Sequence, residues 1–168
     1  DIPDPFMVIA TQNPTGYVGT YPLPEAQLDR FALKINMGYP SQEDELNILR
    51  ARRGENPLDR VAAVISSDDV RELRREAASV EVDEELYRYI VQLIAATRKH
   101  PSLALGASPR ASVALMRLSQ AYALIRGRAY VLPEDIGAIF RSAIAHRLML
   151  RQEAKLRGVR ADDVLGEI

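Results

Sequence analysis

The stretch GTYPLPEAQLDRF, from Gly19 to Phe31, is the part of the sequence that decides the fold. Its glycine and prolines predict a loop, Glu25 to Asp29 predict a brief helix, and Arg30 follows directly. Upstream, Phe6 to Thr11 is a short apolar run typical of a buried strand. Downstream, Phe31 to Met37 alternates apolar and polar residues, which predicts a second strand.

After Pro40 the hydrophobic pattern changes from that of strands to that of helices. Helix caps and apolar residues spaced at i, i+3 and i+4 predict helices over residues 41–53, 67–79, 83–99, 109–127, from 133 onward, and 161–168. Two strands alone make a poor sheet, because each needs neighbours to pair with. We therefore expect a mainly α protein, with a helical bundle preceded by a two-strand remnant of a larger α/β core.

Length and composition exclude several kinds of protein. The chain has 168 residues, of which 47% are hydrophobic and 27% charged, as in ordinary globular proteins. It contains no cysteine, so disulfides and thiolate metal sites are excluded. We expect no metal ligands, no membrane span, no signal peptide and a cytoplasmic location.

Charge is distributed unevenly along the chain. Residues 1–97 hold 10 Lys and Arg against 17 Asp and Glu, whereas residues 98–168 hold 12 against 6. The basic half suits phosphates or an acidic neighbour, and solvated helix faces are the plainer interpretation. These basic residues are spaced singly, without interleaved aromatics, so we expect no nucleic-acid partner.

Asn13 ends the first predicted strand in the string ATQNP. A polar amide at the carboxyl end of a strand is well placed to touch a ligand, and it can orient an attacking water. Taken alone, the residue is better explained as a turn former before Pro14.

Two arginines are candidates for binding phosphate. Arg30 lies in LDRF, and its guanidinium suits bidentate contact with phosphate, although for a lone arginine a surface salt bridge with Asp29 or Glu25 is the favoured explanation. Arg110 lies in GASPRA, in the first predicted turn after an N-cap at Ser108. A cation is disfavoured there and an anion is favoured, so Arg110 either points into solvent or serves a ligand.

The order of the motifs resembles the second half of MoxR-type AAA+ ATPases. The matching strings include FMVIATQNP, GTYPLPEAQLDRF, GYPSQEDELNILR, ATRKHPSLALGASPRA, GRAYVLPEDI and AHRLML. The resemblance implies that Asn13 is the sensor 1 residue, Arg30 the arginine finger that acts on an adjacent subunit, and Arg110 the sensor 2 residue that contacts the γ-phosphate. It also implies that residues 1–40 end the αβα core and that residues 41–168 form the helical lid.

Further expectations follow from the same resemblance. Such proteins form rings, expected to be hexameric, that bind ATP with Mg²⁺ and remodel other proteins, often with a von Willebrand factor A domain partner. This sequence lacks the GxxxxGK[ST] phosphate loop and the Walker B segment, and TGYV at residues 15–18 replaces a glutamate-containing stretch. We therefore expect this chain alone to bind no cofactor and to hydrolyse no ATP.

Two functions stay open on the sequence. The first is the sensor and lid part of an ATP-driven remodelling machine. The second is a non-catalytic helical adaptor that retains the lid for binding a partner. A phosphate-binding part-domain encoded upstream would favour the first function.

Overall fold

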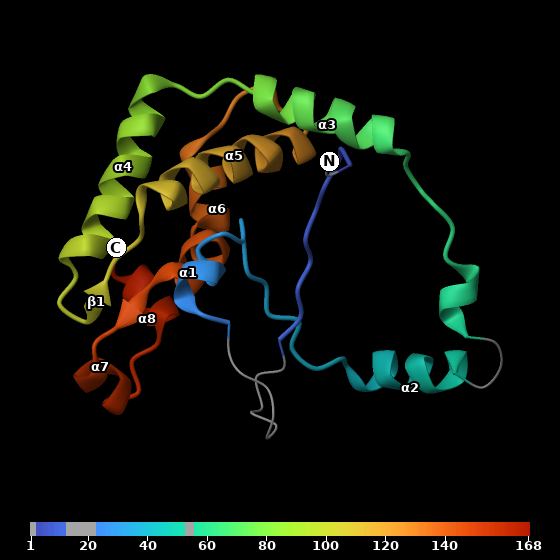
Figure 1. Cartoon of the computed structure of the whole chain (residues 1–168), viewed down its shortest axis with the longest axis horizontal. Helices are drawn as coiled ribbons and strands as arrows, with labels where there is room; N and C mark the ends of the chain where they lie inside the picture. The colour runs from blue at the N-terminus through green and yellow to red at the C-terminus, as the bar shows by residue number, and fades with distance from the viewer. Residues whose placement is uncertain (1–2, 13–22, 53–55) are drawn as a thin grey trace.

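The computed structural model describes residues 3–12, 23–52 and 56–168, and helices dominate it (Figure 1). The elements in chain order are α1 (Glu25–Leu28), α2 (Gln42–Ala51), η1 (Pro57–Arg60), α3 (Ser67–Ser79), α4 (Glu84–Lys99), β1 (Leu103–Leu105), α5 (Pro109–Ile125), α6 (Pro133–Ile144), η2 (Ala145–Arg147), β2 (Met149–Leu150), α7 (Gln152–Leu156) and α8 (Ala161–Gly166). The predicted fold class, mainly α with a helical bundle, is confirmed. Within the described ranges, no helix is both long and apolar enough to cross a bilayer.

Helices α4, α5 and α6 enclose the core, and α3 lies along α5 (Figure 1). Ile94, Leu115 and Ile136, one from each of the three helices, are almost completely buried. The buried polar side chains of α5 are satisfied inside the bundle: the Gln120 amide nitrogen donates to the Val80 carbonyl at 2.8 Å. This bond holds the residue that follows α3 against α5, and it gives the buried Gln120 amide a partner.

A partly buried ion pair between Arg128 and Asp135 shapes the entry into α6. Asp135 is 2% exposed and accepts a hydrogen bond from Arg128 Nη1 at 2.8 Å. The same carboxylate accepts from the backbone N–H of Leu132 at 2.8 Å, and so caps the helix. The Arg128 guanidinium is the main reason why the pKa of Asp135 lies below its usual range. Residues of the GRAYVLPEDI string thus have a structural role, because they form the ion pair and the cap at the start of α6.

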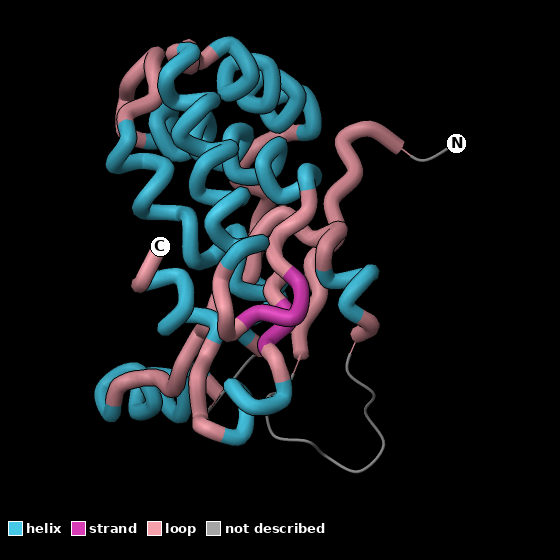
Figure 2. Tube along the Cα trace, turned by 90° about the vertical axis from the view of Figure 1, so that its left-hand side faces the viewer, coloured by secondary structure: helices cyan, strands magenta, loops and turns pink. Residues whose placement is uncertain are grey.

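The two-stranded sheet lies elsewhere in the chain than predicted. Among the described residues, the β ladder is antiparallel and joins β1 to β2, which both follow α4 in the sequence (Figure 2). The predicted strands Phe6–Thr11 and Phe31–Met37 form no ladder. Their sequences favour a strand, but strand formation requires partners, and the described part of the chain offers these segments none.

Both unpaired segments are instead attached to helices by ion pairs or hydrogen bonds. Arg71 and Arg74 of α3 bind the Asp4 carboxylate, with the Arg71 Nε to Asp4 Oδ2 distance at 3.0 Å. The backbone N–H of Lys34 donates to the Ser142 carbonyl of α6 at 2.8 Å. The segment after α1 is therefore attached to the bundle, while remaining without strand partners.

Residues 35–52 and 56–66 lie outside the bundle. Helix α2 buries no side chain, and Figure 1 shows α2 and η1 separated from the other helices. Met37, Tyr39 and Val64 are each at least 90% exposed. The predicted boundary between residues 1–40 and 41–168 stays a prediction.

His146 in η2 connects the segment after α1 to the bundle, and its protonation is expected to weaken the fold. Its Nε2 lies 3.1 Å from the Phe31 carbonyl oxygen, so Nε2 must donate and the ring is the neutral Nε2–H tautomer. Burial is the main cause that lowers the pKa of His146, and the buried Nδ1 has no partner among the described residues. Below the ordinary pKa near 6.5, the unfolded chain binds a proton that the folded His146 resists.

We therefore predict that stability falls as pH falls from 7.5 to 5.5, and that His146→Gln reduces this loss. Glutamine can still donate to Phe31 but does not titrate. Urea midpoints measured by circular dichroism at both pH values test the prediction, with His100→Gln as the matched control at the second histidine. An unchanged pH dependence in His146→Gln would show that His146 is not the group responsible.

Candidate functional site

The loop before α5 is pressed against the end of α4, which fixes where α5 begins. A Cβ on Gly106 would lie 2.6 Å from the backbone Cα of Arg98, so only glycine fits this close approach. The Ala107 N–H donates to Thr97 Oγ1 at 3.0 Å, and Arg98 Nε donates to the Ala107 carbonyl at 2.9 Å. The glycine, alanine and threonine therefore set the position of the arginine that follows in GASPRA.

The start of α5 follows the predicted pattern, with one difference. Ser108 occupies the N-cap position and Pro109 begins the helix, so Arg110 lies in the first turn. The Ser108 hydroxyl makes no capping hydrogen bond. Instead it donates to the Asp29 carboxylate, with both oxygens at 3.2 Å. The prediction of the N-cap position is confirmed, and its expected capping role is corrected: the hydroxyl oxygen accepts no helix N–H, and the Ala111 N–H donates to the Ser108 backbone carbonyl at 2.9 Å.

Asp29, at the end of α1, is the centre of a charged cluster. Arg147 Nη1 lies 3.2 Å from one carboxylate oxygen, and Arg110 Nη1 lies 3.7 Å from the other. The two arginine side chains differ greatly in exposure, at 1% for Arg147 and 57% for Arg110. Arg147 is thus a structural cation inside the protein, whereas Arg110 presents its guanidinium to solvent.

The cluster carries an excess of positive charge. Burial lowers the pKa of Arg147, Asp29 opposes this effect, and Arg110 adds to it, but an arginine stays protonated at neutral pH. Two guanidinium groups therefore face one carboxylate, and the unbalanced charge lies on the exposed Arg110. The N-terminus of a 17-residue helix adds partial positive charge at the same place. This arrangement can bind an anionic group such as phosphate.

Of the three predicted site residues, the structure places two. Arg110 belongs to the cluster, and Arg30 follows Asp29 with an exposed side chain. The Arg30 backbone N–H donates to the Gln27 carbonyl at 3.1 Å, but its side chain makes no hydrogen bond or ion pair with any described residue. Asp29 is turned toward Arg147. The alternative of an Asp29–Arg30 surface salt bridge is therefore not observed. Asn13 lies outside the described residues.

Sequence reasoning missed the two residues that organise this cluster, Asp29 and Arg147. In the sequence, Asp29 stands out only as a surface partner of Arg30, and Arg147 only as part of the string AHRLML. The signal that could have found Arg147 is its place next to the apolar residues Leu148 to Leu150, where a lone charge requires a partner.

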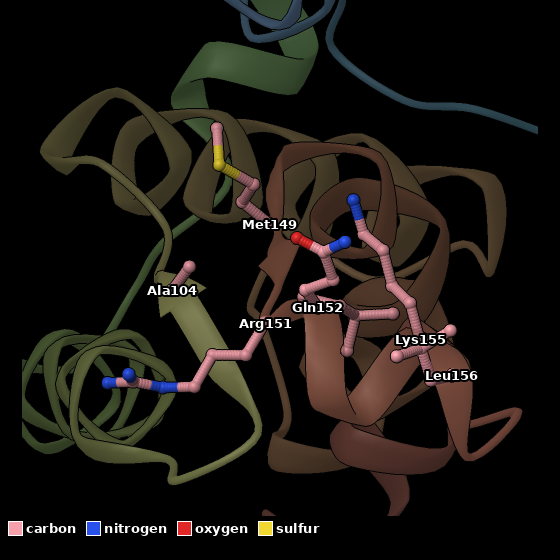
Figure 3. A pocket seen from close by; sticks show the side chains of 7 residues that line it. Ala104, Met149, Arg151, Gln152, Lys155 and Leu156 are labelled. Carbon is pink, nitrogen blue, oxygen red and sulfur yellow. The ribbon is translucent and has the colours of Figure 1, made fainter.

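A hollow elsewhere on the surface does not coincide with this cluster. It lies between β1, β2 and α7, and Figure 3 shows Arg151, Gln152 and Lys155 around it. Arg151 Nε donates to the Leu103 carbonyl at 3.1 Å, so Arg151 has a structural role in joining its segment to β1. None of the predicted site residues lines the hollow. Within the described ranges, no group of three or more His, Cys, Asp or Glu is placed to hold a metal ion.

Family models match both ends of the chain. Residues 1–33 match the model described as ATPase family associated with various cellular activities (AAA), and residues 95–168 match the AAA lid domain model. The first range contains the Asp29–Arg30 pair, and the second contains Arg110 and Arg147. The cluster therefore joins the two matched regions.

Proteins of known sequence or structure resemble the chain over nearly all its length. YeaC of Bacillus subtilis (strain 168) is 48% identical over 98% of this chain and 52% of its own length. The chaperone MoxR1 of Mycobacterium tuberculosis is 42% identical, over 99% of this chain and 45% of MoxR1. A 2.00 Å crystal structure of a candidate ATPase from Cytophaga hutchinsonii superposes with a TM-score of 0.89 at 39% identity, covering 98% of this chain and 52% of that one. The chain spans about half the length of these relatives, and it belongs with the MoxR-type AAA+ ATPases.

Proposed function

We propose that this chain forms the C-terminal sensor and lid part of an ATP-driven, chaperone-like remodelling machine. The observation that carries the proposal is the exposed guanidinium of Arg110 at the positive end of α5, paired to Asp29 only at 3.7 Å. A phosphate group can displace so weak a contact, because a charge-assisted bond to phosphate is shorter and stronger. Arg110 would thereby bind the γ-phosphate of ATP held in its own subunit.

Arg30 and Asn13 complete the proposed assignment. Arg30 is exposed, and its side chain makes no hydrogen bond or ion pair with a described residue, which suits a finger that reaches the ATP of an adjacent subunit. Asn13 would orient the attacking water. Bound ATP supplies the phosphoryl group that is transferred to water. The described residues offer no Mg²⁺ cluster, so both the ion and the β-phosphate would be held by a phosphate-binding half that precedes this chain.

The biological setting is proposed from the relatives. MoxR1 is named a chaperone, and AAA+ ATPases typically assemble as oligomeric rings. We propose a homo-oligomer, hexameric as in the family, that acts in the cytoplasm and cooperates with a von Willebrand factor A domain protein. No observation favours the alternative of a non-catalytic adaptor.

The role proposed for Arg110 is tested in the longer protein that includes the phosphate-binding half. Arg110→Ala should weaken binding of a non-hydrolysable ATP analogue by about tenfold, the loss expected for one charge-assisted hydrogen bond. Its effect on folding should stay within about 0–1 kcal/mol, because the side chain is 57% exposed and its ion pair is long. Tm measured with and without the analogue separates the two effects.

Arg117→Ala is the matched control, since Arg117 lies on the same helix with an exposed side chain. The control should keep the full rise in Tm caused by the analogue. If Arg110→Ala also keeps that full rise, Arg110 is only a surface residue and the sensor assignment is withdrawn.

The role proposed for Arg30 is tested in the assembled longer protein. Arg30→Ala should leave nucleotide affinity nearly unchanged and lower ATP turnover, by as much as roughly 10³–10⁵-fold, because a finger stabilises charge that develops only in the transition state. Arg88→Ala is the control, as Arg88 is exposed and forms an ion pair with Glu84 on its own helix.

Mixing experiments test whether Arg30 acts between subunits. A subunit mutated in its phosphate-binding loop still carries an intact Arg30, so mixing it with Arg30→Ala subunits should restore part of the activity. Light scattering verifies that mixed rings have formed. Absence of recovery in verified mixed rings would contradict action on an adjacent subunit.

A further inference from the structure

We infer that Asp29 is a positioning residue that attaches Arg30 to the lid and makes its position depend on Arg110. The inference deepens the proposed function and rests on the roles proposed there for Arg30 and Arg110. Asp29 has a task distinct from that of either arginine. It connects Arg110, which binds the anion, to Arg30, which acts on the nucleotide of the adjacent subunit. Contacts of the Asp29 carboxylate and of the backbone that follows it carry this inference.

The first step is the attachment of Asp29 itself. Its carboxylate accepts from Arg147 Nη1 at 3.2 Å and from the Ser108 hydroxyl at 3.2 Å. Arg147 has a 1% exposed side chain, and Ser108 stands at the start of α5. A buried guanidinium cannot turn to solvent for another partner, so it holds the carboxylate in place. Asp29 is thus bound to two lid elements that lie far from it in the sequence.

The second step is the attachment of the backbone that follows Arg30, from Phe31 to Lys34. Arg147 Nη2 donates to the Phe31 carbonyl at 2.6 Å, and the Lys34 N–H donates to the Ser142 carbonyl at 2.8 Å. Arg30 is therefore held from both sides, by the Asp29 carboxylate before it and by the Phe31 carbonyl after it. Its backbone has to follow any movement of the lid, while its exposed side chain remains available.

The third step is the contact between Arg110 and the Asp29 carboxylate. Its Nη1 lies 3.7 Å from Asp29 Oδ2, the longest of the contacts made by this carboxylate. An anion that binds Arg110 draws the guanidinium away from Asp29. The carboxylate then keeps Arg147 and Ser108 as its partners and adjusts its position toward them. Because Arg30 is the next residue, this adjustment reaches the Arg30 backbone directly.

The attachment is tested on this chain by hydrogen exchange. Asp29→Asn keeps the shape of the side chain but removes its charge, so the hydrogen bonds from Arg147 and Ser108 lose their charge assistance. We expect exchange at the Lys34 amide to become about tenfold faster, and exchange within α4 to stay unchanged. The control is Asp162→Asn, which removes a carboxylate that pairs with Arg160 at 3.9 Å. Unchanged exchange at Lys34 in Asp29→Asn would overturn the inference.

The dependence on Arg110 is tested by amide NMR with inorganic pyrophosphate as the probe. In the unaltered chain, the Arg110 and Arg30 amide signals should shift together during the titration. In Asp29→Asn, the Arg110 signal should still shift and the Arg30 signal should not. A merely structural role of Asp29 predicts that both signals respond alike in both proteins.

The two measurements separate this inference from the proposed function. If pyrophosphate shifts no Arg110 signal in any variant, the anion-binding role of Arg110 fails and the coupling fails with it, while the exchange data still decide the attachment. If Arg110 responds but Arg30 responds equally with and without the Asp29 carboxylate, the proposed sensor stands and the inference about Asp29 is overturned.

Discussion

The ion pair between Asp29 and the buried Arg147 is the constraint on which the arrangement of the candidate site depends. A guanidinium with a 1% exposed side chain requires compensation, and here the carboxylate and the Phe31 carbonyl provide it. Both acceptors lie in the segment that carries Arg30, more than 110 residues from Arg147 in the sequence. The need to satisfy one buried cation therefore determines where α1 and the following loop lie. The same carboxylate leaves Arg110 with only a long contact, and so leaves one positive charge available at the start of α5.

Local sequence signals predicted the helices well and the strands poorly. Ser66 and Asp69 cap α3, and Ile90, Leu93 and Ile94 form the buried face of α4, because caps and periodicity act within a few residues. Strand pairing depends on segments far apart in the chain. The apolar pattern of Phe6–Thr11 was real, but no neighbour pairs with it in the described structure, whereas β1 and β2 pair over stretches too short to show a pattern.

The candidate site shows the same division between local and long-range information. The first-turn position of Arg110 followed from Ser108 and Pro109, and the structure confirms it. The importance of Asp29 and Arg147 did not follow, since an acid and an arginine so far apart have no visible relation in one sequence. The exposed apolar side chains of α2 and its surroundings, such as Leu49 at 66%, likewise show a pattern whose partner the described residues do not include. Motifs thus identified the groups that meet a ligand, and only the fold identified the groups that position them.

The most direct test of this account is a cryo-EM structure of the assembled longer protein with a non-hydrolysable ATP analogue. The account predicts that the Arg110 guanidinium contacts the γ-phosphate in its own subunit and that Arg30 contacts the nucleotide of the adjacent subunit. It also predicts that the Asp29–Arg147 pair, 3.2 Å apart here, stays intact in every subunit. A structure in which that pair is broken, or in which Arg30 and Arg110 both face solvent while nucleotide is bound, would contradict it.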